Sequence, residues 1–310
     1  TIKSIGTIAE FILYVNMLTW PVAALGWVSS MVQEAEAAQK RINEFLKIEP
    51  EIQNNNNEKS IIEGAISFEN VSYTYEDTNI QALDNISFTI NKGETVAIMG
   101  KTGSGKSTIL SLLTRIHDVT GNSKIKIDGH NLTEYDLYHL RNSMSIVPQD
   151  PFLFSDSIKN NIKFGKEDAT DEEIITAAKM AVVDDNIQSF TNKYETILGE
   201  RGITLSGGQK QRVSIARAII KEAPILILDD CLSAVDTETE EKIVNNFKKI
   251  FNKKTTIIVT HRASAAKNAN KIIVLDSGRI VQEGTHNQLV NQEGFYKDLY
   301  TKQLSEKENA

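Results

Sequence analysis

The chain has 310 residues, of which 40% are hydrophobic and 24% are charged, and its formal net charge at pH 7 is −7. This composition excludes a chain that is disordered throughout, and the acidic balance argues against a nucleic-acid partner, because proteins that bind nucleic acid usually carry a basic face. The single cysteine, Cys231, excludes an intramolecular disulfide and suits a reducing compartment, where we expect a small buried thiol.

The N-terminal segment is apolar, and residues 11–32 carry no charged side chain. A helix of this length reaches about 33 Å at about 1.5 Å per residue, which is enough to cross a hydrocarbon core of about 30 Å. Lys40, Arg41 and Lys47 follow the segment whereas only Lys3 precedes it, so its C-terminal end is expected in the cytosol. We interpret the segment as a membrane span, with a buried core helix and a signal peptide as the alternatives.

The helix is expected to extend beyond the membrane, because apolar residues keep a helical spacing from Ala35 to Leu46, and to end near Pro50. The residues that follow are polar and rich in asparagine, which is typical of a linker. Because residue 1 is a threonine, we expect the chain to be part of a longer or processed product. The predicted divisions are the C-terminal part of a transmembrane domain (1–50), a linker (51–61), a globular domain (62–305) and a tail (306–310).

The globular domain alternates short apolar segments with segments of helical spacing. Half-exposed antiparallel strands are predicted at 65–75 and 82–90. Continuous apolar runs, typical of buried parallel strands, lie at 95–100, 144–149, 224–230 and 255–261. Helical spacing lies at 171–190 and 211–223. The sequence therefore predicts an α/β fold, with a parallel sheet, an antiparallel β edge and a helical insertion around residues 135–215.

A glycine-rich stretch, GKTGSGKST at 100–108, follows one of the predicted parallel strands and opens a helix. It matches the pattern G-x-x-x-x-G-K-[S/T] in the strand–loop–helix context that this pattern needs. Its glycines let backbone N–H groups point at phosphates, and the helix N-terminus adds partial positive charge, so we expect an ATP site in a P-loop ATPase domain. Lys106 is predicted to reach the β and γ phosphates. The other predicted ATP-binding residues of the loop are Gly100, Gly103, Ser104, Gly105, Ser107 and Thr108.

A second predicted strand ends in two adjacent acids, Asp229 and Asp230. A carboxylate at the end of such a strand is the natural partner of the loop hydroxyl in holding Mg²⁺. We therefore expect Asp229 and Ser107 to hold Mg²⁺, and Asp230 to act on the attacking water.

Residues 205–219, LSGGQKQRVSIARAI, make the interpretation specific. Together with the two phosphate motifs they resemble the ATPase domain of ABC transporters, and the N-terminal helix makes the chain resemble an exporter of the multidrug and lipid type. The resemblance covers the whole chain, with residues 1–50 resembling the last membrane helix. Further matches are Tyr75, Gln149, the loop TILGERG at 196–202, the D-loop SAVD at 233–236 with Asp236, and His261.

The resemblance implies a role for each matched residue. Tyr75 would stack on adenine, Gln149 would ligate Mg²⁺ and join the catalytic site to the membrane domain, and His261 would hold the γ-phosphate and the attacking water. Two such domains would pack head to tail with two ATP molecules between them. The signature residues, which would contact the ATP bound by the other subunit, are Ser206, Gly207, Gly208 and Gln209.

Asp230 departs from the family pattern, which has a glutamate at this position. A general base must come within about 2.6 to 3.2 Å of the proton that it takes. An aspartate is shorter by one carbon–carbon bond, roughly 1.5 Å. Because loss of a general base typically lowers a rate by about 10² to 10⁴, we predict slow turnover at this site and normal ATP binding. The alternative is that Asp230 is a sufficient base.

The resemblance implies a second half-transporter as partner, and the aspartate favours a heterodimer in which the partner carries the glutamate. The alternatives are a homodimeric exporter, a soluble ABC ATPase that acts on DNA or ribosomes, and a regulatory nucleotide-binding subunit. The expected location is the plasma or inner membrane, with several spans in the full-length protein and a cytoplasmic ATPase domain. The transported substrate is not defined, because one membrane helix does not form a cavity.

Overall fold

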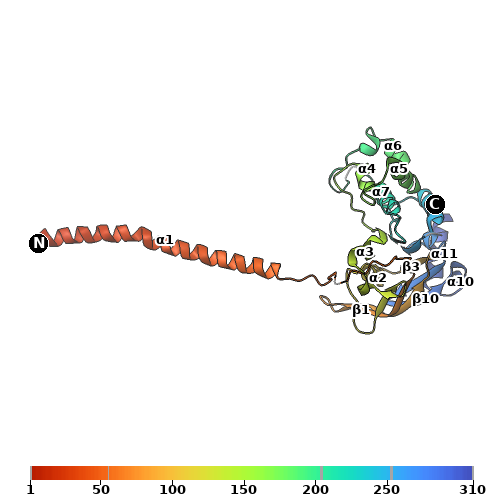
Figure 1. The fold of residues 1–310 in the computed structure, drawn as a ribbon, viewed down its shortest axis with the longest axis horizontal. Coiled ribbons are helices and arrows are strands. Elements are labelled where there is room, and N and C mark those ends of the chain that lie inside the picture. Colours follow the sequence, from red (N-terminus) through yellow and green to blue (C-terminus); the bar gives the residue numbers. More distant parts are fainter. Residues whose placement is uncertain (1, 55, 203–204, 252–253, 309–310) are drawn as a thin grey trace. The chain divides into compact units, whose positions relative to one another are not determined.

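The structure is a computed structural model that describes residues 2–54, 56–202, 205–251 and 254–308. The chain divides into two units, Thr1–Glu51 and Ile52–Ala310 (Figure 1). Each unit is described by itself below.

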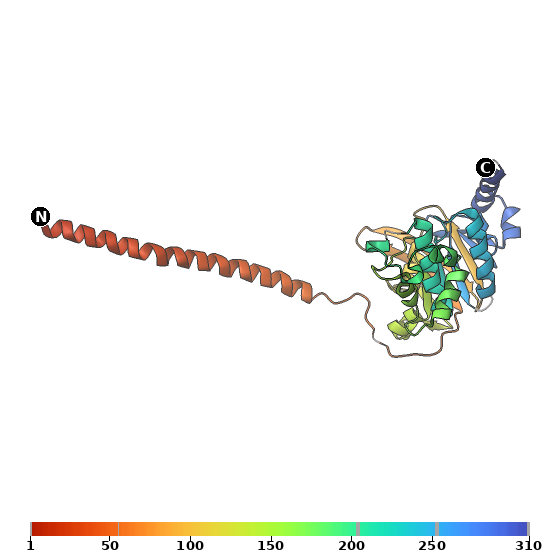
Figure 2. The same cartoon turned by 90° about the horizontal axis from the view of Figure 1, so that it is seen from above.

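The first unit is a single helix, α1 (Ile2–Leu46), which has 45 residues and contains Pro21 (Figure 2). The stretch Ile5–Leu46 includes an apolar window with a mean hydropathy of 1.5, and none of that window is buried. Soluble monomers rarely expose so large an apolar surface, and about 20 apolar residues are enough to span a bilayer. The predicted span and its extension to Leu46 thus form one continuous helix.

The second unit contains an antiparallel sheet with the strand order β2-β1-β4-β5 in its described residues. Its strands are β1 (Ile66–Tyr75), β2 (Ile80–Ile90), β4 (Lys124–Ile127) and β5 (His130–Asn131). The β1–β2 pair, with Phe68 opposite Phe88, is the predicted antiparallel edge. The two rings stack at 4.5 Å between centroids and contribute to the core beneath the sheet.

The larger sheet has the strand order β10-β9-β3-β8-β7-β6 in the described residues. Its strands are β3 (Thr95–Gly100), β6 (Met144–Val147), β7 (Ile225–Asp229), β8 (Thr255–Val259), β9 (Lys271–Asp276) and β10 (Arg279–Gly284). The four predicted strands are parallel, β9 joins them in parallel, and β10 closes the edge antiparallel. Because the carboxyl ends of parallel strands meet at one edge, the segments that follow β3, β6, β7 and β8 are brought together there.

The helices of the second unit are α2 (Lys106–Leu113), α3 (Leu137–Asn142), α4 (Ile158–Lys163), α5 (Asp171–Met180), α6 (Asp184–Gln188), α7 (Gly207–Ile220), α8 (Thr237–Phe251), α9 (Ala263–Ala266), α10 (His286–Val290) and α11 (Phe295–Glu308). The predicted helical segment at 171–190 divides into α5 and α6, because Val182 adopts a left-handed φ of 56° between them. The predicted tail begins inside α11. The helices of the insertion, α4 to α7, gather on one side of the unit (Figure 1).

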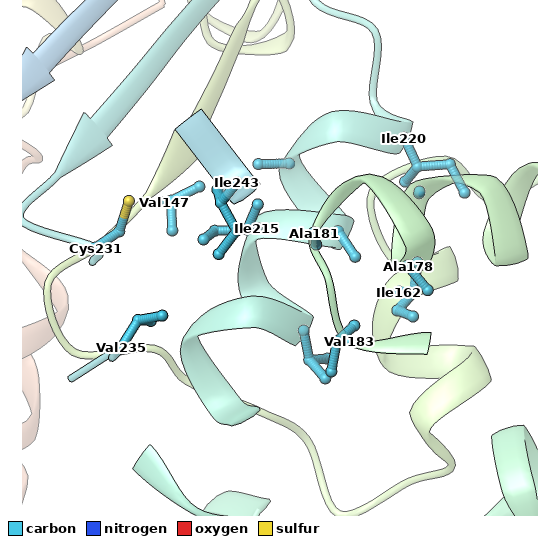
Figure 3. Packing of buried hydrophobic residues seen from close by; sticks show 14 of the residues in the cluster. Val147, Ile162, Ala178, Ala181, Val183, Ile215, Ile220, Cys231, Val235 and Ile243 are labelled. Carbon is cyan, nitrogen blue, oxygen red and sulfur yellow. The ribbon is translucent and has the colours of Figure 1, made fainter. Parts of the chain in front are cut away.

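Two large apolar clusters hold these layers together. One lies between the two sheets and α2, and includes Phe68, Ile98 and Ile109. The other joins the helical insertion to the larger sheet, and Figure 3 shows Ile215 of α7 among its members. Cys231 belongs to the second cluster and is buried, as predicted.

The predicted linker is attached to the second unit at several points. Asn54 donates a hydrogen bond to the Asp136 carboxylate at 2.8 Å and accepts one from the Leu137 N–H at 2.8 Å. His139 bonds the Ser60 carbonyl through its ring nitrogen at 2.9 Å. These contacts fix the segment along the domain surface at α3.

Candidate functional site

The glycine-rich loop that follows β3 has a backbone that only glycine accommodates at two positions. Gly100 and Gly105 have φ values of 148° and 103°. A Cβ atom at Gly100 would lie 2.2 Å from the carbonyl oxygen of Leu275, and one at Gly105 would lie 2.6 Å from that of Ala82. The loop therefore curls tightly over the strand end, which is the arrangement that turns backbone N–H groups inward.

Lys106 is 7% exposed and begins α2. Its ammonium group donates to the carbonyl oxygens of Gly100 at 2.9 Å and Lys101 at 2.8 Å, so it lies across the mouth of the loop. Burial lowers the pKa of Lys106, and the nearby Asp230 and Asp229 oppose that effect. Gly105 precedes the helix and provides no side-chain cap, so the first N–H groups of α2 and the ammonium group together favour an anion.

The acid pair lies at the end of β7. Burial raises the pKa of Asp229, the charge of Asp230 adds to this, and the charge of Lys106 partly opposes it. Burial likewise raises the pKa of Asp230. Asp230 adopts a left-handed φ of 43°, a conformation in which aspartate is more common than most residues. Two half-buried acids beside a buried ammonium group are a typical setting for cation and proton chemistry.

The other predicted residues lie on segments that reach the same sheet edge or the helix that follows the loop. Gln149 follows β6 and His261 follows β8, and both side chains are exposed. Tyr75 ends β1, and its hydroxyl lies 3.1 Å from that of Thr108 in α2. Its ring meets that of Tyr73 edge-on at 5.1 Å between centroids, and Tyr73 itself packs against the core.

Ser107, Asp229 and Gln149 offer a hydroxyl, a carboxylate and an amide oxygen, which are the ligand types that Mg²⁺ accepts. No group of three His, Cys, Asp or Glu side chains suited to a metal occurs in the part of the chain that is described. A small set of protein oxygens fits Mg²⁺ in nucleotide sites, because this ion usually takes its remaining ligands from phosphates and water.

The signature segment forms the N-terminus of α7. Ser206 accepts a hydrogen bond from the Gln209 N–H at 3.3 Å, and the Gln209 side chain accepts one from the Ser206 N–H at 2.9 Å. A Cβ atom at Gly208 would lie 2.8 Å from the carbonyl oxygen of Ala234 in the D-loop, so this glycine allows the two segments to approach each other. Gly207 also lies beside Ala234.

Two residues outside the predicted set connect these segments. Gln211, which is buried, donates to the Ser233 hydroxyl at 3.3 Å and accepts from the Ala234 N–H at 3.1 Å. Arg262 donates to the Ser233 carbonyl at 2.9 Å. The sequence indicated these residues only by their position, because Gln211 follows the signature and Arg262 follows His261. Asp236, at the other end of the D-loop, accepts from the Thr239 N–H at 2.9 Å and caps α8.

Comparisons with known proteins agree with this geometry. Residues 83–233 match the family model described as ABC transporter. The Bacillus subtilis (strain 168) protein YgaD, whose name assigns it to multidrug export, is 43% identical over 300 residues, which are 96% of this chain and 52% of that protein. An ATP-dependent lipid A-core flippase of Haemophilus ducreyi is 42% identical over 287 residues, covering 92% of this chain and 49% of the flippase.

Among solved structures, a bacterial Atm1-family ABC exporter with ATP bound superimposes with a TM-score of 0.84 at 35% identity, covering 94% of this chain and 51% of the exporter. The chain spans about half the length of the curated relatives that it matches.

The fold and the site define an ATPase domain of the α/β P-loop class. With the matches above, the chain carries an ABC transporter ATP-binding domain, and the relatives named above are described as a multidrug export protein, a lipid flippase and an exporter. The match to a solved exporter extends over nearly the whole chain. The helix α1, which is long and apolar enough to cross a membrane, is therefore the membrane helix of this chain, and the ATP-binding domain is cytoplasmic. The predicted resemblance to exporter-type ABC transporters is confirmed at this level.

Proposed function

We propose that the chain is part of an exporter subunit that binds and hydrolyses ATP to move a substrate across the membrane. The observation that carries the proposal is the presence of two phosphate-type loops in one domain: the loop before α2, and the signature before α7, which contacts the D-loop. Closure of two domains on ATP, and their reopening after hydrolysis, would move the membrane helices between two states.

The roles proposed for the site follow from the placements above. Lys106 holds the β and γ phosphates, and Tyr75 stacks on adenine, with its hydroxyl on Thr108 orienting the ring. Mg²⁺, held by Ser107, Asp229 and Gln149, would neutralise phosphate charge. The loop backbone from Gly100 through Gly103, Ser104 and Gly105 surrounds the phosphates, and His261 contacts the terminal one.

The signature residues are proposed to act on a nucleotide bound by a partner subunit. Ser206 and Gln209 form a reciprocal cap, so α7 presents an ordered N-terminus with partial positive charge to an anion. Ala234 of the D-loop, whose last residue is Asp236, lies against Gly207 and Gly208. The partner is a second ABC half-transporter, and the two associate within a lipid bilayer.

Contact with the membrane domain is proposed for the segment after Gln149. Phe152 and Phe154 are 53% and 39% exposed, and Phe164 is 67% exposed. The guanidinium group of Arg217 lies 5.6 Å from the ring centres of both Phe154 and Phe164 and donates to the Phe152 carbonyl at 2.8 Å. An exposed aromatic group of this kind, fixed by a half-buried cation, suits a protein interface.

Asp230 is proposed to be a weak base, and its backbone supports this. Its N–H donates to the Val259 carbonyl at 2.8 Å, and its carbonyl accepts from the Ser233 N–H at 3.2 Å. Because the peptide groups on both sides of Asp230 are bonded, a backbone shift that restores the missing reach of roughly 1.5 Å would break at least one of these bonds. ATP binding would remain, since Lys106 and Asp229 are in place.

We therefore favour a heterodimer, in which this chain binds ATP for long periods at its own site and completes a working site on a partner that carries glutamate. A homodimeric exporter, with Asp230 as an active base, is the second candidate, and the exporter names of the relatives fit it equally well.

The test is ATP turnover of the full 310-residue chain in lipid nanodiscs, compared with its Asp230→Glu variant under identical conditions. An increase of about tenfold or more supports the weak base, since general-base catalysis contributes about 10² to 10⁴. Lys106→Ala is the inactive control, and ATP affinity of the glutamate variant should match that of the parent. Equal or lower turnover in an Asp230→Glu variant that still binds ATP would contradict the proposal that Asp230 is a weak base, and would favour the homodimer.

A further inference from the structure

We propose that Gln303, in the C-terminal helix α11, is a positioning residue that holds His261 at the terminal phosphate of ATP. The proposal rests on the role proposed for His261 above. It extends the site to a helix far from the phosphate loop in the sequence.

The Gln303 side chain bonds the peptide groups on both sides of Arg262. Its Nε2 donates to the carbonyl oxygen of His261 at 2.9 Å, and its Oε1 accepts from the N–H of Ala263 at 2.8 Å. Ala263 begins α9, and the first N–H groups of a helix have no partner within it. Arg262, at the cap position, makes no side-chain cap. The glutamine amide therefore supplies a partner for the first N–H group of α9 and, with its second hydrogen bond, fixes the peptide group between His261 and Arg262.

The position of Gln303 is set by the part of α11 that lies in the core. Tyr296 is fully buried and belongs to an apolar cluster that includes Ala266 of α9 and Leu289 of α10, with Leu299 packed against it. Tyr296, Leu299 and Gln303 are separated by three and four residues, so they share one face of the helix. Two turns, about 10 Å, therefore connect the buried tyrosine to the glutamine amide.

The loop that carries His261 is also held from its other side. Arg262 donates to the Ser233 carbonyl at 2.9 Å and pairs with Glu240 of α8. The loop is thus bonded to α11 through its backbone and to the D-loop through the Arg262 side chain, while the His261 side chain stays exposed. A side chain on a fixed backbone loses less conformational freedom when it meets a ligand, which strengthens a directional contact.

This arrangement predicts a selective effect on the γ-phosphate. Without the Gln303 amide the His261 loop is less ordered, so the affinity for ATP falls while the affinity for ADP, which lacks that phosphate, is unchanged. A purely structural role for Gln303 would lower both affinities together.

The experiment measures the affinities of Mg-ATPγS and Mg-ADP for the full chain in lipid nanodiscs. Gln303→Met keeps the length of the side chain but removes both hydrogen bonds. It is expected to weaken ATPγS binding about threefold to tenfold, the range for one or two neutral hydrogen bonds, with ADP binding within about twofold of the parent. Gln303→Glu keeps the acceptor for Ala263 and should have a smaller effect. Lys302→Met, at an exposed site of the same helix, should change neither.

His261→Ala separates the two proposals. It should weaken ATPγS binding at least as much as Gln303→Met, and the double variant should be no weaker than His261→Ala alone. If His261→Ala lowers ATPγS affinity selectively and Gln303→Met does not, the positioning role is wrong and the role of His261 stands. If Gln303→Met and Gln303→Glu weaken the binding of ATPγS and of ADP equally, the positioning role of Gln303 is also contradicted. If His261→Ala has no selective effect, both proposals fail.

Discussion

The ion pair between Arg262 and Glu240 gives a prediction whose size follows from burial. The Glu240 side chain is 3% exposed and that of Arg262 is 33% exposed. Removing one partner of a buried pair typically costs about 3–5 kcal/mol, because the remaining charge is left without compensation. Arg262 keeps about a third of its contact with water, and the Ser264 hydroxyl still donates to Glu240 at 2.7 Å. We therefore expect Arg262→Ala to lower the free energy of unfolding by about 2–3 kcal/mol.

The assay is urea unfolding of the chain in detergent micelles, followed by circular dichroism. Tryptophan fluorescence is unsuitable, because Trp20 and Trp27 both lie in α1. The matched control is Lys242→Ala, which removes the pair with Glu238 on the same helix. Those side chains are 59% and 81% exposed, so a change within about 0.5 kcal/mol is expected. A loss for Arg262→Ala no larger than that of the control would refute the reasoning from burial.

Three further predictions follow from the site. Burial and a neighbouring carboxylate raise the pKa of Asp229, so its contribution to stability is present below its unfolded pKa of about 3.9 and is lost as pH rises through the folded value. Asp229→Asn should therefore raise the urea midpoint at pH 7 while lowering Mg-dependent turnover, and an unchanged midpoint contradicts this. Gly105→Ala should abolish ATP binding measured by calorimetry, because its Cβ would lie 2.6 Å from the Ala82 carbonyl oxygen, whereas Gly103→Ala, with nothing within 4 Å, should be milder; equal effects would count against the steric argument. Cys231 should react with iodoacetamide only after unfolding, because burial raises the pKa of its thiol, and rapid labelling of the native chain would show the opposite.

The sequence predicted the structure best where the residues of one short segment determine the conformation of that same segment. The glycines of the phosphate loop allow conformations that other residues resist, so the pattern and its geometry are local. The buried strands are also local, because continuous apolar runs such as Ile225–Asp229 need cover on both faces. The division between α5 and α6 was missed, since Val182 in a left-handed conformation contradicts its residue type. Strands β9 and β10 were also missed, although the apolar run and the turn at Ser277 and Gly278 carried a signal.

Contacts between distant segments were not predictable in the same way. Asn54 and Asp136 are 82 residues apart, and Gln303 and Ala263 are 40 apart. In the second contact the partner is a backbone N–H, which every residue except proline provides, so no residue type at position 263 indicates it. Such contacts depend on the tertiary arrangement, here on the burial of Tyr296, and become visible only when the fold is known.

The proposed weak base and the proposed positioning contact have a joint consequence. In these proposals the short acid at position 230 slows proton transfer, whereas Gln303 and Arg262 order the loop that carries His261. The Arg262–Glu240 pair also stabilises the fold, whereas Gln303 bonds the loop that carries His261. Taken together, the two proposals describe a site that distinguishes ATP from ADP while turning ATP over slowly. In such a site bound ATP acts mainly as a stable link between two domains, and the energy for reopening must come from hydrolysis at the other site.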